Sequence, residues 1–201
     1  MPRTKEQFAE MRQASQRKIR TAAIRLFAQK GFAATSIDDI VEAAGLSKGM
    51  FYRHYETKEA LFSSLLEAAA AGTLELIGDM KSDNDPREIV ESITADIYEH
   101  MTDDSEFADL MMVMTQRLMS KDIPGNDELI GIDVQAVAAG IGLIRRGQEM
   151  GVFGVGDPQE MAVYFFSAIQ GVVMMKFAVG EHFQMPNPSL MTAFLYRGLQ
   201  E

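Results

Sequence analysis

Residues 36–55 read SIDDIVEAAGLSKGMFYRHY and have the pattern of two short helices. In the first half, apolar side chains recur at helical spacing and Gly45 supplies a stop. In the second half, Ser47 can cap a new helix that the pattern carries to about Tyr55. Two helices joined by so short a turn, with a glycine in it, are the signature of a helix-turn-helix.

The start of the first of these helices has two candidate caps. Thr35 or Ser36 can accept hydrogen bonds from its free amides, and Asp38 and Asp39 favour the positive end of its dipole. Thr57 gives the same signal further on, where KEALF begins another helix at Lys58.

The second helix of the motif has two chemically different faces. Phe51 and Tyr55 lie four residues apart and extend the apolar face toward the preceding helices. The other face carries a cation, a bare backbone, a phenol and a guanidinium, from Lys48, Gly49, Tyr52 and Arg53, with His54 at its end. Such groups can hold phosphates and read base edges, so we expect this face to meet DNA. A solvated helix face is the plainer alternative.

The charge of the chain is divided unevenly. The 201 residues carry a formal net charge of −10, with 47% hydrophobic and 24% charged residues. Residues 1–60 hold 11 Lys and Arg against 7 Asp and Glu, whereas the remainder holds 8 against 22. A basic first third on an acidic body suggests that only the first part meets a polyanion.

Composition also limits the compartment and the chemistry. Cysteine is absent, which excludes disulfides and thiolate metal sites and makes the cytoplasm the simplest compartment. No apolar stretch near the N-terminus resembles a secretory signal. The apolar segment 161–179 approaches spanning length, but Gln170 and Lys176 interrupt it, so we expect a buried helix and no membrane.

Helical spacing continues along the whole chain, with breaks at SDNDP (82–86), KDIPGND (121–127), GVFGVGDP (151–158) and PNP (186–188). About nine helices are therefore expected, in an all-α fold. We expect a helix-turn-helix domain over residues 1–60 and a second helical domain over 61–201. Residues 1–16 form a basic extension: an arm along DNA through Arg3, Lys5 and Arg12, a disordered tail, or an extension of the first helix.

Residues 17–66 closely resemble the DNA-binding domain of TetR-family transcriptional regulators. The resemblance rests on A-x-x-L-F and K-G-F, then T-S-I-D-D-I-V, A-A-G-L-S-K-G, F-Y-R-H-Y and K-E-A-L, in that order. It covers about fifty consecutive residues, whereas the rest of the chain is similar only in helical organisation.

The resemblance implies roles for individual residues. Thr35 or Ser36 would cap the second helix and touch a phosphate, Ser47 would cap the third, and Tyr52, His54 and Lys58 would contact phosphates. Lys48, Gly49 and Met50 would face base edges or the adjoining backbone. A guanine contact from Arg53 is our own inference, since that position varies in the family. A dimer with two reading helices implies a palindromic operator in double-stranded DNA.

The resemblance also implies that the C-terminal domain dimerises and binds a small effector. A methionine-rich helix suits an apolar effector, and its expected lining residues are Met101, Phe107, Met111, Met114, Arg117 and Leu118. Alternatively, the methionines of this helix are ordinary hydrophobic core. Glu91, Asp96 and Glu99 could instead attract a cationic effector. Segments 158–179 and 189–199 are expected to form a homodimer interface through Phe165, Ile169, Val172, Val173, Phe194 and Leu195.

Other classes of function find less support. The three histidines, His54, His100 and His182, lie far apart, and no nucleophile elbow, P-loop or dinucleotide fingerprint occurs, so we expect no enzyme, cofactor or metal. The expected function is a repressor released from DNA by an apolar small molecule. The alternative is a DNA-binding regulator without an effector or with a protein partner, or an activator.

Overall fold

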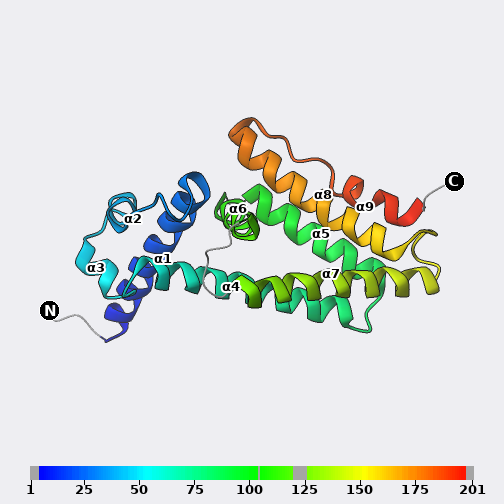
Figure 1. The fold of residues 1–201 in the computed structure, drawn as a ribbon, viewed down its shortest axis with the longest axis horizontal. Coiled ribbons are helices and arrows are strands. Elements are labelled where there is room, and N and C mark those ends of the chain that lie inside the picture. The colour runs from blue at the N-terminus through cyan, green and yellow to red at the C-terminus, as the bar shows by residue number, and fades with distance from the viewer. Residues whose placement is uncertain (1–4, 104, 120–125, 198–201) are drawn as a thin grey trace. The chain divides into compact units, whose positions relative to one another are not determined.

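The computed structural model describes residues 5–103, 105–119 and 126–197, and over these residues the chain is all-α with nine α-helices and no strand. This confirms the predicted fold class. The helices are α1 (Lys5–Lys30), α2 (Ile37–Ala44), α3 (Lys48–Tyr52), α4 (Lys58–Lys81), α5 (Pro86–Asp103), α6 (Ser105–Met119), α7 (Asn126–Glu149), α8 (Pro158–Val179) and α9 (Pro188–Arg197), with a short 3-10 turn, η1 (Gly180–His182) (Figure 1).

One helix end differs from the expected one, and a second selects among the stated alternatives. α3 ends at Tyr52 and not near Tyr55, because the amides of His54 and Tyr55 both donate to the Phe51 carbonyl, at 2.9 and 3.0 Å. The shared acceptor closes the last turn tightly and ends the regular helix. Near the N-terminus, α1 begins at Lys5, so the described part of the basic extension is a helical continuation of α1.

The helices divide into two compact units. The first contains α1, α2, α3, α4 as far as Ala69, and α6 from Asp109 onward; the second contains the remainder of α4 and α6 together with α5, α7, α8 and α9. A domain boundary near residue 60 stays a prediction.

The first unit has an aromatic centre. The rings of Phe27 and Phe62 meet edge to face at 5.2 Å, and Phe32 packs against both. Ile19 of α1 and Phe51 of α3 are also fully buried in this unit, Phe51 on the apolar face that its spacing predicted. This core fixes α3 against α1 and α2, so the opposite face of α3 is left outward.

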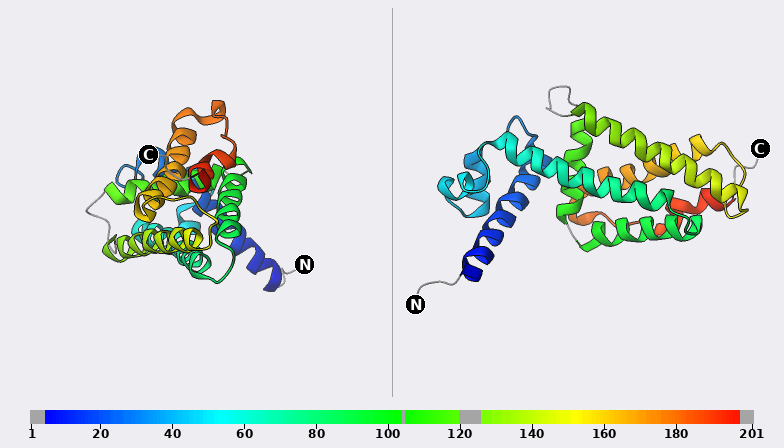
Figure 2. Two further views of the ribbon diagram at one scale, coloured as in Figure 1. Left: turned by 90° about the vertical axis from the view of Figure 1, so that its right-hand side faces the viewer. Right: turned by 90° about the horizontal axis from the view of Figure 1, so that it is seen from below.

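The second unit is built around α5, α7, α8 and α9, which pack in the pairs α7–α8, α5–α7, α5–α9 and α8–α9. The same four helices lie together in both views of Figure 2. Its core includes Val90, Leu143, Met161, Phe165 and Leu195, all buried.

Two segments are long and apolar enough to cross a membrane by length and composition alone: α4, and Pro158–His182, which contains α8. Each buries one side in the helical fold, through Leu61 and Leu65 of α4 and through Phe165 and Val173 of α8. Core helices of proteins without a membrane span have this same pattern.

Candidate nucleic-acid interface

The start of α2 is fixed by Ser36. Its hydroxyl accepts a hydrogen bond from the Asp39 amide at 3.1 Å, and the Asp39 carboxylate accepts one from the Ser36 amide at 2.8 Å. The Ser36 hydroxyl also donates to the Asp39 carboxylate at 2.7 Å, and this bond, followed by the one from the Ser36 amide and the charge of Lys30, lowers the pKa of Asp39. The result is a reciprocal capping box that holds the first turn of α2 in place.

Thr35 has a different role from the expected one. Its side chain is 1% exposed, and its hydroxyl donates to the Gly31 carbonyl at 2.8 Å. It neither caps α2 nor reaches solvent, so the predicted phosphate contact from this side chain is wrong. Of the two candidate caps, the structure selects Ser36.

The turn between α2 and α3 follows from two local signals. Gly45 has φ 63°, a left-handed conformation that glycine adopts without strain, and the Leu46 amide returns to the Val41 carbonyl. Ser47 then caps α3 by accepting from the Met50 amide at 3.3 Å, as predicted. Together these residues place α3 directly after α2.

The outward face of α3 carries the expected groups. Lys48, Gly49, Tyr52 and Arg53 are exposed, Met50 is half-buried, and Phe51 anchors the opposite face in the core. A Cβ at Gly49 would find only the Ser47 hydroxyl, at 3.8 Å, so packing within the chain does not require glycine there. The absent side chain instead leaves the backbone open to a partner.

Lys48 is paired on the surface of the free protein. Its ammonium lies 2.8 Å from the Asp38 carboxylate, and this hydrogen bond, with the charge of Asp38, raises the pKa of Lys48. Both side chains are well exposed, so the pair contributes little stability and a phosphate can compete for the lysine. Arg53 lies 3.9 Å from the Met50 sulfur, a long contact.

His54 is turned toward α1. Its Nε2 lies 2.8 Å from the Ser15 hydroxyl, which also donates to the Arg12 carbonyl, so Nε2 carries the hydrogen that bonds to Ser15. Burial, and then the charges of Arg12 and Arg53, lower the pKa of His54. In this neutral tautomer Nδ1 is only an acceptor, so the predicted phosphate contact requires a second proton on the ring, at Nδ1. Sequence reasoning missed the brace from Ser15, because nothing in the spacing links residues 39 positions apart.

Lys58 is used largely within the fold. Its ammonium donates to the carbonyls of Phe32 and Thr35, at 2.8 and 2.7 Å, and lies 4.3 Å from the centre of the Phe32 ring. Two of its three N–H groups therefore hold the loop before α2. One N–H group of Lys58 remains for the predicted phosphate contact.

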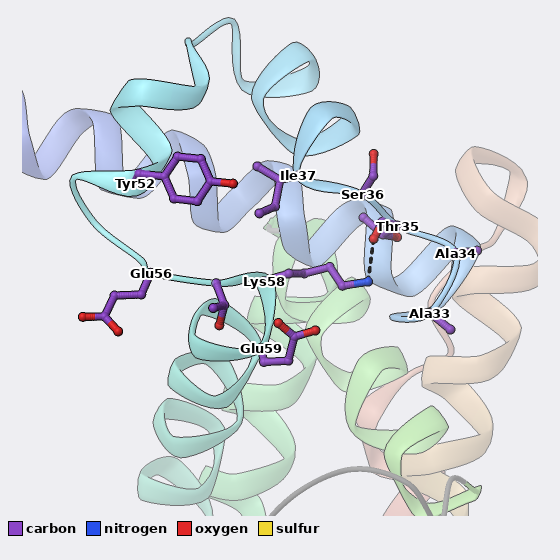
Figure 3. Close-up of a pocket in the computed structure, with 10 residues that line it drawn as sticks. Ala33, Ala34, Thr35, Ser36, Ile37, Tyr52, Glu56, Lys58 and Glu59 are labelled. Atoms are coloured by element: carbon purple, nitrogen blue, oxygen red, sulfur yellow. Dashed lines mark hydrogen bonds between the residues drawn. The ribbon is translucent and has the colours of Figure 1, made fainter.

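A cavity of about 490 Å³ lies beside these groups, between the start of α2, the start of α4 and Tyr52. Figure 3 shows Lys58 reaching from α4 to Thr35, while the Glu56 side chain lies at the outer edge. Thr57 caps α4 by accepting from the Ala60 amide at 3.0 Å, so two capped helix N-termini line one cavity. Helix N-termini favour anions, and the phenol of Tyr52 can donate to one.

The residues expected around an effector do not form one described cavity. Met101 and Phe107 belong to the second unit, whereas Met111, Met114, Arg117 and Leu118 belong to the first. Met101 and Arg117 are buried, but Leu118 is 53% exposed, so its expected place in an enclosed pocket is wrong.

The expected dimer residues are largely on the inner side of their helices. Phe165, Ile169, Val173 and Leu195 are buried in the core of the second unit, which overturns their assignment to an interface. Val172 and Phe194 are half-buried against the same core. Sequence reasoning missed the apolar side chains that α8 exposes instead, namely Val163, Tyr164, Met174, Met175 and Val179.

Among the described residues, no three His, Asp or Glu side chains gather as metal ligands would.

Comparisons with known proteins match this geometry. Residues 19–65 match the model of the family described as bacterial regulatory proteins, tetR family. The chain is 34% identical over 122 residues to the uncharacterized HTH-type transcriptional regulator YerO of Bacillus subtilis (strain 168), covering 59% of this chain and 40% of the relative. It thus spans less than half the length of the curated relatives that it matches first.

Two solved structures share the fold over most of the chain. NalD, the secondary repressor of the MexAB-OprM multidrug efflux pump in Pseudomonas aeruginosa, has a TM-score of 0.66 at 20% identity, over 92% of this chain and 95% of that one. A SmeT–triclosan complex has a TM-score of 0.58 at 20% identity, over 90% of each chain. The curated relatives are described as HTH-type transcriptional regulators. Residues 19–65 therefore form a DNA-binding domain of the TetR family of bacterial regulatory proteins, in a chain that shares its all-helical fold with solved TetR-family structures.

Proposed function

We propose that the protein binds double-stranded DNA as a homodimer and represses transcription from a palindromic operator in the cytoplasm. One observation carries the proposal: Lys48, Gly49, Tyr52 and Arg53 are presented together on the outward face of α3, whose inward Phe51 is fixed in the core. A helix so anchored can enter a major groove without rearranging the domain.

A phosphate of the DNA backbone would bind in the cavity beside α3, between the starts of α2 and α4. The capped starts of α2 and α4 and the Tyr52 hydroxyl suit one phosphate beside the groove that α3 reads. Of Thr35 and Ser36, Ser36 is the exposed one, so it takes the phosphate role once shared with Thr35, and its hydroxyl would exchange the Asp39 carboxylate for the phosphate.

The dimer would use the outer face of α8. Val163 and Met174 are eleven residues apart, as are Tyr164 and Met175, so each pair is nearly in line along the helix. The two lines are neighbours on the outer face of α8, and together they form the apolar stripe. Such a stripe suits helix packing between two copies of the chain.

Release by a small molecule completes the proposal. The SmeT structure contains triclosan, a small ligand. We infer an apolar small-molecule effector for this chain by analogy with that fold alone. An effector releases the operator when it binds the DNA-incompetent state better, and tenfold release needs about 1.4 kcal/mol of coupling. A regulator without an effector, or an activator, is the alternative within the same class.

Selection of random duplexes on the purified protein tests the DNA-binding role. We expect a palindrome to be recovered, and the Tyr52→Ala, Lys48→Ala double variant to lose it. Recovery of no sequence preference by a folded dimer would refute the proposal.

Single lysine variants sharpen the test. Lys48→Met should weaken binding and reduce the salt slope of log K by about one, because one phosphate contact is lost. Asp38→Asn should strengthen binding, since it frees Lys48 and removes a negative charge. Lys58→Met should chiefly destabilise the fold, by about 1–3 kcal/mol, because it removes the donor to two carbonyls. If Lys58→Met leaves stability intact and reduces the salt slope as Lys48→Met does, Lys58 is a phosphate ligand and not a brace.

A further inference from the structure

A groove of about 540 Å³ lies between α5 and α9 in the second unit. None of its lining residues belongs to the helix-turn-helix or to the six expected to line the apolar effector pocket, but Glu91 is one of the three acids that could attract a cationic effector. Its volume is within the range of small-molecule sites, about 300–1,000 Å³.

Short side chains on both helices keep the groove open. Thr94 and Ala95 of α5 and Thr192 and Ala193 of α9 face it. The Thr94 hydroxyl is already used by the Val90 carbonyl at 2.7 Å, and the Thr192 hydroxyl makes a long bond, 3.5 Å, to the Ser189 carbonyl. With their hydroxyls turned to the backbone, the threonines add apolar surface to that of the alanines.

Two acceptors interrupt this apolar lining. Glu91 is exposed, and its carboxylate lies 3.9 Å from Arg87, a long surface pair that a ligand can replace. Tyr196 also lines the groove, and its buried hydroxyl has no hydrogen-bond partner among the described residues. The Arg87 guanidinium lies 4.4 Å from the centre of the Tyr196 ring, at the same end of the groove.

We propose that the α5–α9 groove binds a small amphiphile with an apolar body and a protonated amine. The body would lie against the alanines and threonines, and the ammonium would donate to Glu91 and to the Tyr196 oxygen. A carboxylate ligand would meet Glu91 with like charge and is disfavoured. This site goes beyond the proposed function, because it needs neither DNA nor the effector pocket.

Titration of the full chain with octylamine at pH 7, in the absence of DNA, tests the proposal. With Ala and Thr methyl groups labelled for NMR, we expect saturable shifts at Ala95 and Ala193 with one site per chain. Octanol should bind several-fold more weakly and octanoate at least tenfold more weakly, because only the amine pairs with Glu91.

Two matched pairs of variants locate the site. Ala95→Leu should fill the groove and weaken octylamine binding at least tenfold, whereas Ala138→Leu, at an exposed position of α7, should not change it. Ala95 is itself exposed, so the leucine requires no repacking of the core. Glu91→Gln should weaken octylamine several-fold and leave octanol unchanged, while Glu88→Gln, one turn earlier and outside the lining, should change neither.

Each contrary result would refute one part of the proposal: the location of the site, the role of the amine, or the existence of the site. Undiminished binding by Ala95→Leu places octylamine elsewhere, and equal affinities for octylamine and octanol refute the role of the amine. Absence of saturable shifts below the micelle concentration refutes the site. Operator selection is measured separately, so its failure and this one are distinguishable.

Discussion

Gly147 shows what one missing side chain does in the second unit. The ring of the buried Phe153 lies directly over it, and a Cβ at this position would overlap the ring. The amides of Val152 and Phe153 also return to the Gly147 carbonyl, at 2.8 and 3.1 Å, so the turn after α7 cannot move away freely.

Gly147→Ala should therefore destabilise the chain by about 1–3 kcal/mol, the usual cost of overpacking. Gly142→Ala is the matched control, because Gly142 lies on the exposed side of the same helix with open space around it. That control should stabilise by about 0.5–1 kcal/mol. Urea denaturation of both variants measures whether each change raises or lowers the free energy of unfolding. A denaturation midpoint for Gly147→Ala at or above that of the parent would contradict the packing argument.

His54 makes stability depend on pH. Its pKa is lowered in the folded chain by burial and by Arg12 and Arg53, so the unfolded chain takes up this proton first as the pH falls. The free energy of unfolding should be insensitive to His54 above about pH 6.5 and should fall below it. Denaturation at pH 7.5 and 5.5 measures the loss, which His54→Gln should reduce and His182→Gln, an exposed control, should not. An equal pH dependence in all three proteins would exclude His54 as its source.

Single-residue roles were the least accessible from the sequence. Thr35 and Ser36 are adjacent hydroxyls of equal capping ability, and only the burial of Thr35 against Gly31 separates them. Lys58 looked like a phosphate ligand, yet two carbonyls from the loop before α2 hold it. Both outcomes depend on tertiary contacts that no local pattern encodes.

At the scale of helices, prediction succeeded where caps and spacing agree. Gly45 and Ser47 set the turn of the motif, and Thr57 sets the start of α4, each by a local hydrogen bond. The face of α8 could not be predicted, because this helix is apolar on most sides and its periodicity does not say which stripe is buried. The segment was correctly expected to be a helix, but Phe165 and Val173 were placed on the wrong side of it.

α6 is tied to α1 within the first unit by one side chain. The Gln116 amide donates to the Ala28 carbonyl at 2.8 Å, across 88 residues of sequence. Ala28 lies in the last turn of α1, where carbonyls lack partners within the helix.

Gln116→Leu should loosen this attachment by about 1 kcal/mol, which corresponds to roughly fivefold faster amide exchange in α6 from residue 109 to 119. Gln135→Leu, on the exposed side of α7, is the control for adding the same apolar side chain. Hydrogen exchange followed by mass spectrometry reports both. If the two variants exchange alike in α6, the Gln116 bond does not hold the helix.

For the whole molecule, we propose that the outer face of α8 decides the state of assembly. Tyr164 is 69% exposed and Met175 is 53% exposed, although both are large and apolar. A stripe of such side chains on one helix is typical of a surface that another chain covers. A dimer would also bring together two copies of α3, which a palindromic operator requires.

Met175→Glu tests this arrangement with little effect on the single chain, because the side chain already meets solvent in the monomer. In the dimer the carboxylate would be buried without a partner, so the dissociation constant should rise by at least a hundredfold, about 2.7 kcal/mol. Val134→Glu, at an exposed position of α7, adds the same charge away from the stripe and should leave the mass unchanged. Sedimentation equilibrium over a range of concentrations measures both. Since a monomer reads one half-site, Met175→Glu should also lose its preference for two correctly spaced half-sites over one; dimers that persist in both variants would move the interface to another face.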